Sequence, residues 1–330
     1  RLNPAGDDRH LFVSEPDAFR LLDLGTWTRA HGDHGHSYVT APRYTDITFP
    51  AAKPGHVVEH DGSTALFSDG SGTIETFTTS HLGNERPRTT TVTLPSPHHG
   101  VAIPLHGGGL VHTLGTEDAR RTISVRDQSG ATVASTDACP GVHGEAAAAG
   151  RTLVFGCTDG AVVLSGSTFT KVQAAVPYAR SGNLAGSPKS PVMLADYKTD
   201  KDAVLERPTK INLIDTVAKR ARQVELGASY SFRSLARGPK GDALVLTTDG
   251  RLTVVDAASG TVVTRIPVVG PWTEPDDWQE ARPAVRVFGK LAYVTEPAKK
   301  RIHVVDLTTN QLTASGDVGF VPNEISGNRG

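Results

Sequence analysis

The chain has 330 residues, a hydrophobic fraction of 38% and a formal net charge of -1 at pH 7. This balanced charge lacks the basic footprint that attracts nucleic acids and anionic membrane surfaces, so neither is expected as a partner. No run of eighteen apolar residues is present, so membrane insertion is not expected, and the start without Met or a signal-peptide core is typical of a trimmed mature form.

Short alternating strands that end in an acidic residue recur along the chain, and 34 Gly and 21 Pro supply tight turns between them. Clear copies occupy residues 19–23, 122–127, 211–215, 252–256 and 302–306, with further copies at 72–77 and 161–164. Asp127, Asp215, Asp256 and Asp306 are separated by 88, 41 and 50 residues, so one unit has about 40 to 50 residues and the longest gap holds two units. Units of this length, built from four strands, predict a β-propeller.

Counted from Asp23 to Asp306, the repeat predicts an all-β propeller with seven blades in a single domain, residues 1–330. Eight blades are an alternative if residues 180–227 hold an extra unit. Two stacked β-sandwiches are another alternative, which the single repeat period disfavours. Residues 10–14 have the pattern of a second strand and residues 322–326 that of a first strand. We therefore expect the C-terminal strand to complete the first blade, because such closure removes exposed sheet edges.

A histidine-rich segment follows the first strands. Within six positions, among glycines and without an apolar period, it places His31, Asp33, His34 and His36. Imidazole and carboxylate together suit zinc, although copper and nickel also fit. A solvated polar loop or the remnant of a purification tag is the alternative, but a tag would be terminal and purely histidine. We expect residues 28–53 to form a flexible loop from the first blade to the second, ending beside His56 on the same face.

Histidines recur at the expected start of the innermost strand in three consecutive blades. They are His56, His99 and His143. Innermost strands line the central channel of a propeller and start at one mouth, so the three side chains are expected to converge on a metal site. Taken singly, each fits a hydrogen-bonded turn histidine, and His98 replaces His99 if the register is off by one. Asp69 or Asp159 is a candidate fourth ligand, with a plain Asp-Gly hairpin turn as the alternative.

The chain has two cysteines, Cys139 and Cys157. An even count favours one disulfide, which indicates an oxidising, exported setting. The alternative makes both thiolates zinc ligands beside His143. Structural zinc sites usually take their cysteines from close Cys-x-x-Cys pairs, however, and none is present in the sequence.

Three motifs accompany the histidine-rich segment: Pro-His-His-Gly-Val-Ala-Ile-Pro-Leu at residues 97–105, Cys-Pro-Gly-Val-His-Gly-Glu-Ala at 139–146 and Val-Phe-Gly-Cys-Thr-Asp-Gly at 154–160. Together they resemble the bacterial AztD zinc metallochaperones over most of the chain. The resemblance implies an exported propeller, periplasmic or extracellular, that binds zinc and passes it to the solute-binding protein of a zinc ABC transporter. It matches His99 and His143 to the family's channel-mouth histidines, and the histidine-rich segment to its mobile metal-binding segment. His56 rests on the register alone, and the fourth channel ligand is not placed.

Two other classes of function compete with a zinc carrier. A zinc hydrolase would use three protein ligands and leave one position open for water, yet Gly-x-Ser-x-Gly and His-Glu-x-x-His motifs are absent. The carboxylate pairs Asp7 with Asp8 and Asp276 with Asp277 are adjacent, which suits solvated turns better than acid–base catalysis. A protein-interaction scaffold explains the blades but leaves both histidine groups without a role. The sequence therefore favours a monomeric zinc carrier over a scaffold, and a scaffold over an enzyme.

Overall fold

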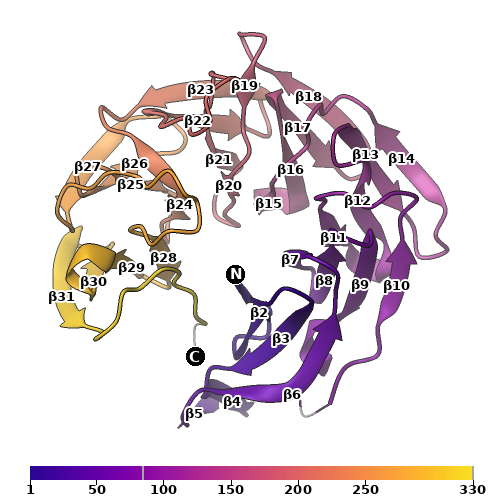
Figure 1. Cartoon of the computed structure of the whole chain (residues 1–330), viewed down its shortest axis with the longest axis horizontal. Coiled ribbons are helices and arrows are strands. Elements are labelled where there is room, and N and C mark those ends of the chain that lie inside the picture. The colour runs from indigo at the N-terminus through magenta and orange to yellow at the C-terminus, as the bar shows by residue number, and fades with distance from the viewer. Residues whose placement is uncertain (84, 329–330) are drawn as a thin grey trace. The chain divides into compact units, whose positions relative to one another are not determined.

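The structure, a computed structural model, describes residues 1–83 and 85–328. Every regular element in this part of the chain is a strand, apart from four 3-10 turns. The strands form seven antiparallel sheets of four, one of which gains an extra strand, and a separate two-stranded hairpin (Figure 1). The prediction of an all-β propeller with seven blades is confirmed. No helix in the described part is long and apolar enough to cross a membrane.

The chain divides into two compact units, the first comprising Arg1–Asp137 with Ser326–Gly330 and the second Ala138–Ile325. Three sheets belong to the first unit. The first sheet consists of β1 (Leu2–Pro4), β2 (His10–Ser14), β3 (Ala18–Asp23) and β6 (Arg43–Pro50). The second consists of β7 (Pro54–His60), β8 (Ser63–Ser68), β9 (Thr73–Thr78) and β10 (Thr90–Thr93). The third consists of β11 (Ala102–Pro104), β12 (Leu110–Gly115), β13 (Arg120–Arg126) and β14 (Thr132–Thr136). The 3-10 turns η1 (Thr79–His81) and η2 (His106–Gly108) follow β9 and β11.

The second unit holds four sheets. Two consist of β15 (Glu145–Ala148), β16 (Thr152–Cys157), β17 (Asp159–Ser165) and β18 (Thr168–Gln173), with β19 (Ala179–Arg180) beside β17; and β20 (Leu184–Ala185), β21 (Val192–Asp196), β22 (Lys210–Asp215) and β23 (Arg220–Glu225). The others consist of β24 (Tyr230–Arg237), β25 (Ala243–Thr247), β26 (Arg251–Val255) and β27 (Val262–Pro267); and β28 (Val285–Phe288), β29 (Leu291–Glu296), β30 (Arg301–Asp306) and β31 (Gln311–Asp317). Its 3-10 turns are η3 (Ala149–Arg151) and η4 (Pro297–Lys299).

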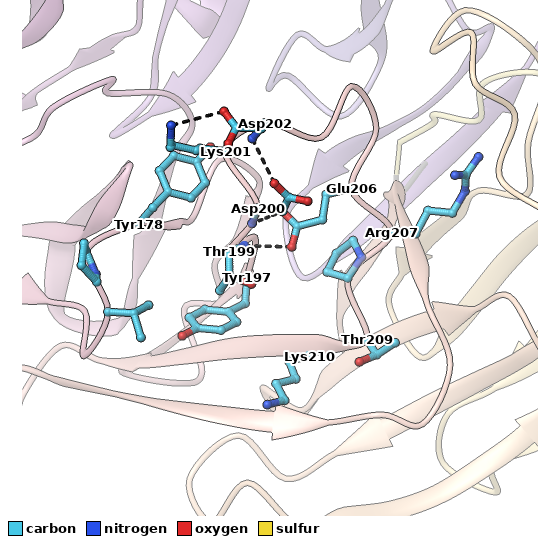
Figure 2. A pocket seen from close by; sticks show the side chains of 13 residues that line it. Tyr178, Tyr197, Thr199, Asp200, Lys201, Asp202, Glu206, Arg207, Thr209 and Lys210 are labelled. Atoms are coloured by element: carbon cyan, nitrogen blue, oxygen red, sulfur yellow. Dashed lines mark hydrogen bonds and ion pairs between the residues drawn. The ribbon is translucent and has the colours of Figure 1, made fainter.

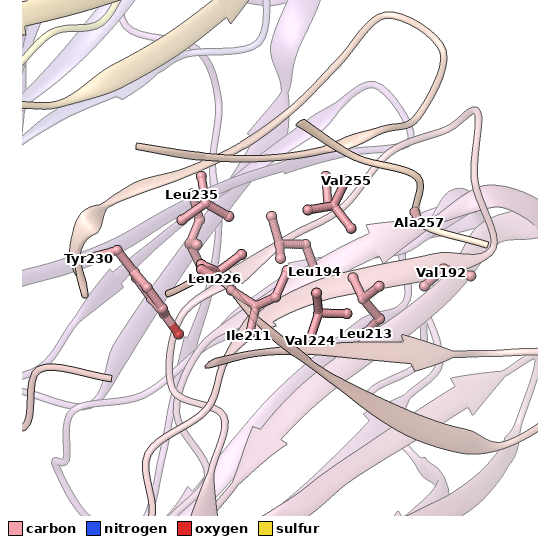
Figure 3. Packing of buried hydrophobic residues seen from close by; sticks show 12 residues of the cluster. Val192, Leu194, Ile211, Leu213, Val224, Leu226, Tyr230, Leu235, Val255 and Ala257 are labelled. Atoms are coloured by element: carbon pink, nitrogen blue, oxygen red, sulfur yellow. The ribbon is translucent and has the colours of Figure 1, made fainter. Parts of the chain in front are cut away.

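The core lies between neighbouring sheets of each unit, because alternation along a strand directs its apolar side chains to the faces of the sheet. In the first unit the Phe49 ring packs between two others, with ring centroids 5.6 Å from Phe12 and 5.3 Å from Phe77. In the second unit Leu194 and Leu213 of one sheet are buried in a cluster with Val255 of the next (Figure 3). Burying each such side chain contributes about 1.5 to 3 kcal/mol, so the sheets provide a rigid frame without a metal.

The first blade is completed by its own N-terminal strand, so the prediction of closure by the C-terminal strand is wrong. β1 pairs antiparallel with β2, with Asn3 opposite Phe12. Residues 318–328 lie in no strand, although the Asn328 side chain donates to the Thr26 carbonyl at 3.2 Å. β1 has only three residues and ends in Pro4, which leaves too short an alternation to be recognised from sequence.

The histidine-rich segment is a hairpin, not a structureless connection between blades. β4 (Thr26–His31) and β5 (His34–Val39) pair with Trp27 opposite Tyr38, and β6 follows as the outer strand of the first sheet. Gly32 begins the two-residue turn with φ of +60°, which suits glycine at this position. Most of the hairpin is exposed on both faces, so its sequence carries no apolar period and resembles a loop.

The hairpin and His56 leave opposite ends of β6, so the expectation that they share one face is wrong. β6 runs antiparallel to β3, with Asp23 opposite Arg43 and Ala18 opposite Pro50. The hairpin connects Asp23 to Arg43, whereas Pro50 leads into β7 and His56. An eight-residue strand spans about 23 Å, which separates the two points of attachment.

Cys139 and Cys157 form a disulfide with their Cα atoms 4.9 Å apart, and no free cysteine is present in the described part. The predicted disulfide is confirmed, and the alternative of two thiolate ligands is wrong. The bond ties the segment before β15 to the end of β16, next to the residues that position His143.

Candidate metal centre

The three histidines of the hairpin lie on one face of it. Cross-strand pairing puts His31 opposite His34, and strand alternation returns His36 to the same face. Their ring centroids are 5.0 to 5.6 Å apart, and one ligand nitrogen from each lies within 4.8 Å of the others. Asp33 adds a carboxylate beside them, with Oδ1 3.1 Å from Nδ1 of His34. This hydrogen bond lowers the pKa of the Asp33 carboxyl, so the cluster offers three imidazoles and one ionised carboxylate.

The base of the hairpin is anchored on the turn between β1 and β2. The Trp27 and Tyr38 rings stack with centroids 5.1 Å apart, and the Arg9 guanidinium lies 4.0 Å from the Trp27 ring. The same guanidinium pairs with the Asp23 carboxylate at 2.7 Å and holds the pKa of that carboxyl below its ordinary value. An isolated two-stranded hairpin is marginally stable, so these contacts fix its direction while its tip stays in solvent.

A second group lies where β7 begins, and it joins His56, His99 and Asp69. The His56 and His99 rings have centroids 5.1 Å apart. His99 Nδ1 lies 2.6 Å from Oδ2 of Asp69, in the turn between β8 and β9. Gly55 permits this approach, because a Cβ there would lie 2.1 Å from Asp69 Oδ1. A side chain at position 55 would therefore displace the carboxylate that holds His99.

The Asp69 carboxylate has the chemistry of an orienting group for a metal-binding histidine. With Nδ1–H of His99 donating to Asp69, Nε2 becomes the nitrogen that can ligate, as in carboxylate–histidine–zinc arrangements. Oδ1 of Asp69 is buried and makes no hydrogen bond within the described part of the chain. A buried oxygen of this kind is unfavourable unless a donor or a cation compensates it. The residues present therefore fit a divalent cation.

His98 points into the protein and both of its ring nitrogens are engaged. Nδ1 lies 3.1 Å from the Ser96 carbonyl and Nε2 lies 3.0 Å from Oγ1 of Thr113. Burial lowers the pKa of the His98 imidazole. His98 therefore acts as a structural histidine, and His99 is the member of this pair that lies beside His56.

His143, in the second unit, is held by two hydrogen bonds to backbone. Its Nδ1 donates to the Gly182 carbonyl at 2.7 Å, and its backbone N–H donates to Gly156 at 3.0 Å. A bond from Nδ1 to a carbonyl directs Nε2 to act as the ligand nitrogen, which is the usual second contact of a metal-binding histidine. Asp159 of the same unit forms an ion pair with Lys171, which gives its carboxylate a structural partner.

Two contacts at the His99 site were not anticipated. Asp69 contacts Nδ1 of the His99 imidazole, whereas the sequence suggests Asp69 as a direct metal ligand. Glu117 Oε2 accepts the backbone N–H of His99 at 3.2 Å. Glu117 carries no motif that indicates this contact; only its place in the turn between β12 and β13 brings it there.

Comparisons with known proteins relate the chain to other proteins in sequence and in fold. No family model matches the chain. The zinc chaperone AztD of Citrobacter koseri is 28% identical over 307 residues, which is 89% of this chain and 70% of that protein. The crystal structure of Citrobacter koseri AztD has a TM-score of 0.83 at 24% identity, covering 98% of this chain and 87% of that one. BamB from Moraxella catarrhalis has a TM-score of 0.56 at 14% identity, covering 96% and 87%.

The two structural likenesses show the fold alone, while the sequence match adds a relationship to one named protein. The chain is therefore related in sequence and in fold to the zinc chaperone AztD, as its motifs predict.

Proposed function

We propose that this protein is a zinc carrier, which binds the ion at His56 and His99 and passes it to the solute-binding protein of a zinc ABC transporter. Zinc is the cargo, held reversibly and released unchanged. Two observations support the proposal: the sequence relationship to a zinc chaperone, and the pairing of His99 with a buried carboxylate beside His56. A carrier needs a metal site and no catalytic group, so the proposed role is not enzymatic.

The observation that carries the proposal is the environment of Asp69. One of its oxygens holds His99, and the other is buried without a hydrogen bond in the described residues. Zinc bound at Nε2 of His99 would place a positive charge near this carboxylate and compensate its burial. Two imidazoles on a rigid frame also suit the borderline character of Zn²⁺.

His143 is proposed as a further zinc ligand, on the strength of its own geometry. The bond from Nδ1 to Gly182 fixes the ring, and the disulfide between Cys139 and Cys157 fixes the backbone around it. A ligand held in advance loses little conformational freedom when it binds, which favours a tight site.

The histidine hairpin is proposed as a second and separate zinc site. His31, His34 and His36 are exposed, so water and competing ligands reach the ion easily. The hairpin leaves the end of β6 that is remote from β7, so it is not a neighbour that accepts zinc from His56. We infer that it loads independently and binds zinc less tightly than the rigid site.

The disulfide supports an exported location, in the periplasm or outside the cell, because such bonds persist in oxidising compartments. Transfer to a solute-binding protein would take place there. A carrier that acts as a monomer presents its metal site to one acceptor at a time.

A zinc competition titration tests the proposal. His99→Ala should weaken the tightest zinc site at least tenfold, while His81→Ala, which removes an exposed histidine of the same unit, should leave the affinity unchanged. Stopped-flow measurements should then show zinc passing from the loaded parent to an apo solute-binding protein faster than zinc dissociates into a chelator. Equal affinity in parent and His99→Ala, or transfer no faster than dissociation, would contradict the proposal.

A further inference from the structure

A loop of the second unit, between β27 and β28, is held in one shape by a buried arginine. Arg282 is 0% exposed, and its Nη1 pairs with Oε1 of Glu274 at 2.8 Å. Its Nη2 donates to the Asp277 carbonyl at 2.5 Å and its Nε to the Glu280 carbonyl at 3.3 Å. Burying an ion pair costs desolvation energy. Here the buried guanidinium holds two backbone carbonyls and one side chain of the loop in place. The loop is therefore kept in one conformation at the surface.

The loop presents an aromatic side chain among acidic groups. Trp278 is 54% exposed. Residues 266–281 contain four acidic and no basic residues. Glu274 pairs with Arg282, and Asp276 pairs with Arg207 at 2.6 Å. Asp277 and Glu280 make no ion pair within the described part, so the surroundings of Trp278 keep a net negative charge.

The segment after β31 lies against this loop and adds apolar surface. Asn323 Nδ2 donates to the Gln279 carbonyl at 3.1 Å, and Arg233 Nη1 donates to the Asn323 carbonyl at 2.7 Å. These bonds hold Phe320 and Val321 in the segment that runs past the loop, where they are 63% and 51% exposed. The aromatic residues of loop and segment are therefore presented by one hydrogen-bonded network.

A cavity continues the surface on the other side of the loop. It has a volume of about 800 Å³ and is lined by Tyr178 and Tyr197 on one side and by Arg207 on the other (Figure 2). Arg207 joins the cavity to the loop, because its Nη2 donates to the Glu274 carbonyl at 2.9 Å as well as pairing with Asp276. Val204, in the segment between β21 and β22, is fully exposed.

All these segments lie at one edge of the sheets. The second and fourth strands of each antiparallel sheet end at the edge where the first strand begins. The segments follow β21, β27 and β31, whereas His143 precedes β15. The exposed aromatic residues and this proposed zinc ligand therefore share the same edge of the second unit.

We propose that these residues form a docking surface for a protein that offers a basic rim around an apolar recess. The docking surface consists of Val204, Arg207, Asp277, Trp278, Glu280, Phe320 and Val321. The inference rests on the proposed function in one respect, namely that the partner is the solute-binding protein that accepts the zinc.

The negative charge of the docking surface favours a basic partner protein over a second copy of this chain. Tryptophan and tyrosine dominate binding energy at interfaces when they enter a pocket of the partner, and a rigid loop loses little entropy on binding. The carboxylates of Asp277 and Glu280 would attract lysine or arginine around that pocket and raise the association rate. A second copy of this chain would bring the same acidic loop against this one across a twofold axis, which is repulsive.

Zinc transfer from the full-length, zinc-loaded chain to an apo solute-binding protein tests this inference. Trp278→Ala should lower the second-order transfer rate at least tenfold. Asp277→Asn combined with Glu280→Gln should lower the rate severalfold and flatten its dependence on salt. Zinc affinity should stay at the parent value in both variants. The controls are Val217→Ala, an exposed residue of the turn between β22 and β23 at the opposite edge, and Asp46→Asn.

The outcomes separate this inference from the proposed function. If the parent transfers zinc and Trp278→Ala does so at the same rate, the docking surface is wrong and the carrier role stands. If the parent transfers none, the carrier role and the assignment of the partner both fail. If Trp278→Ala leaves the transfer rate unchanged but alters the sedimentation coefficient of the chain in the absence of a partner, the surface binds a second copy of this chain and the inference is overturned.

Discussion

The Asp69 carboxylate lies 2.6 Å from Nδ1 of His99, and its second oxygen is buried against the backbone of Gly55. In the proposed zinc site this contact would select the tautomer of His99 that carries its proton on Nδ1, and Nε2 would then be the ligand nitrogen. A carboxylate that would not itself contact the ion would thus orient the histidine that binds it.

Asp69→Asn should weaken zinc binding by about tenfold without unfolding the protein, because the amide keeps the size of the carboxylate but loses its charge. Asp46→Asn, which removes an exposed carboxylate of β6, is the matched control. Competition titration gives the affinities, and thermal unfolding of the zinc-free proteins verifies the fold. If Asp69→Asn binds zinc with the affinity of the parent, Asp69 does not orient His99 for binding.

Gly55→Ala should also weaken zinc binding, through space rather than charge. The added Cβ would lie 2.1 Å from Asp69 Oδ1, so the carboxylate must move away from His99. Gly83→Ala is the control, because a Cβ there has no atom within 4 Å. We expect the zinc affinity to fall in Gly55→Ala and to stay at the parent value in Gly83→Ala. Equal affinities in the two variants would show that zinc binding does not need the contact between Asp69 and His99.

Replacing His31, His34 and His36 together by Ala should remove one weakly bound zinc per chain and leave the tightest site unchanged. The reason is that the hairpin and β7 join opposite ends of β6, so the two groups share no ligand. Equilibrium dialysis with elemental analysis counts the ions. A matched fall in the tightest affinity would mean that the hairpin folds back to the His56 side.

Removing the disulfide with Cys139→Ser and Cys157→Ser should lower the free energy of unfolding by about 3 kcal/mol, the value for a closed loop of this size. Urea denaturation of the zinc-free protein measures the change. The parent should also resist alkylation until it is reduced, as intact mass would reveal. Two thiols that react without reductant would refute the bond.

As the pH falls below 6.5, His112 should lower the free energy of unfolding at pH values where most carboxylates are still ionised. Burial lowers the pKa of His112 below its ordinary value of 6.5, and its Nε2 makes no hydrogen bond in the described part. The unfolded chain therefore takes up a proton below pH 6.5 while the folded chain does not, so stability falls as the pH decreases from 6.5 towards the folded pKa. His112→Leu should lose part of this fall between pH 7 and 5.5, measured by urea unfolding. An identical pH profile in the variant would assign the fall to other groups.

The blade repeat could be predicted because each blade carries its own alternating strands and acidic turns. Its closure could not, because β1 is a three-residue strand ending in Pro4, and residues 322–326 resemble a first strand more closely in sequence. A short strand is stabilised by the sheet it joins, and its own sequence holds little of that information.

The candidate ligands could be named from the sequence, but their surroundings could not. His56 and His99 stand at corresponding positions in the repeat, and the structure puts their rings side by side. The role of Asp69 depends on a backbone approach at Gly55, 14 positions earlier in the chain. The histidine hairpin resembles a loop in sequence, because most of it is exposed and hydrophobic periodicity therefore carries no signal there.

The most direct test of the zinc site is a crystal structure of the protein loaded with one equivalent of zinc, with anomalous data collected at the zinc edge. We expect a single strong peak about 2.0 to 2.1 Å from Nε2 of His99, with His56 also in the coordination sphere and Asp69 still hydrogen-bonded to Nδ1. A peak only at His31, His34 and His36, or no ordered zinc at all, would contradict it.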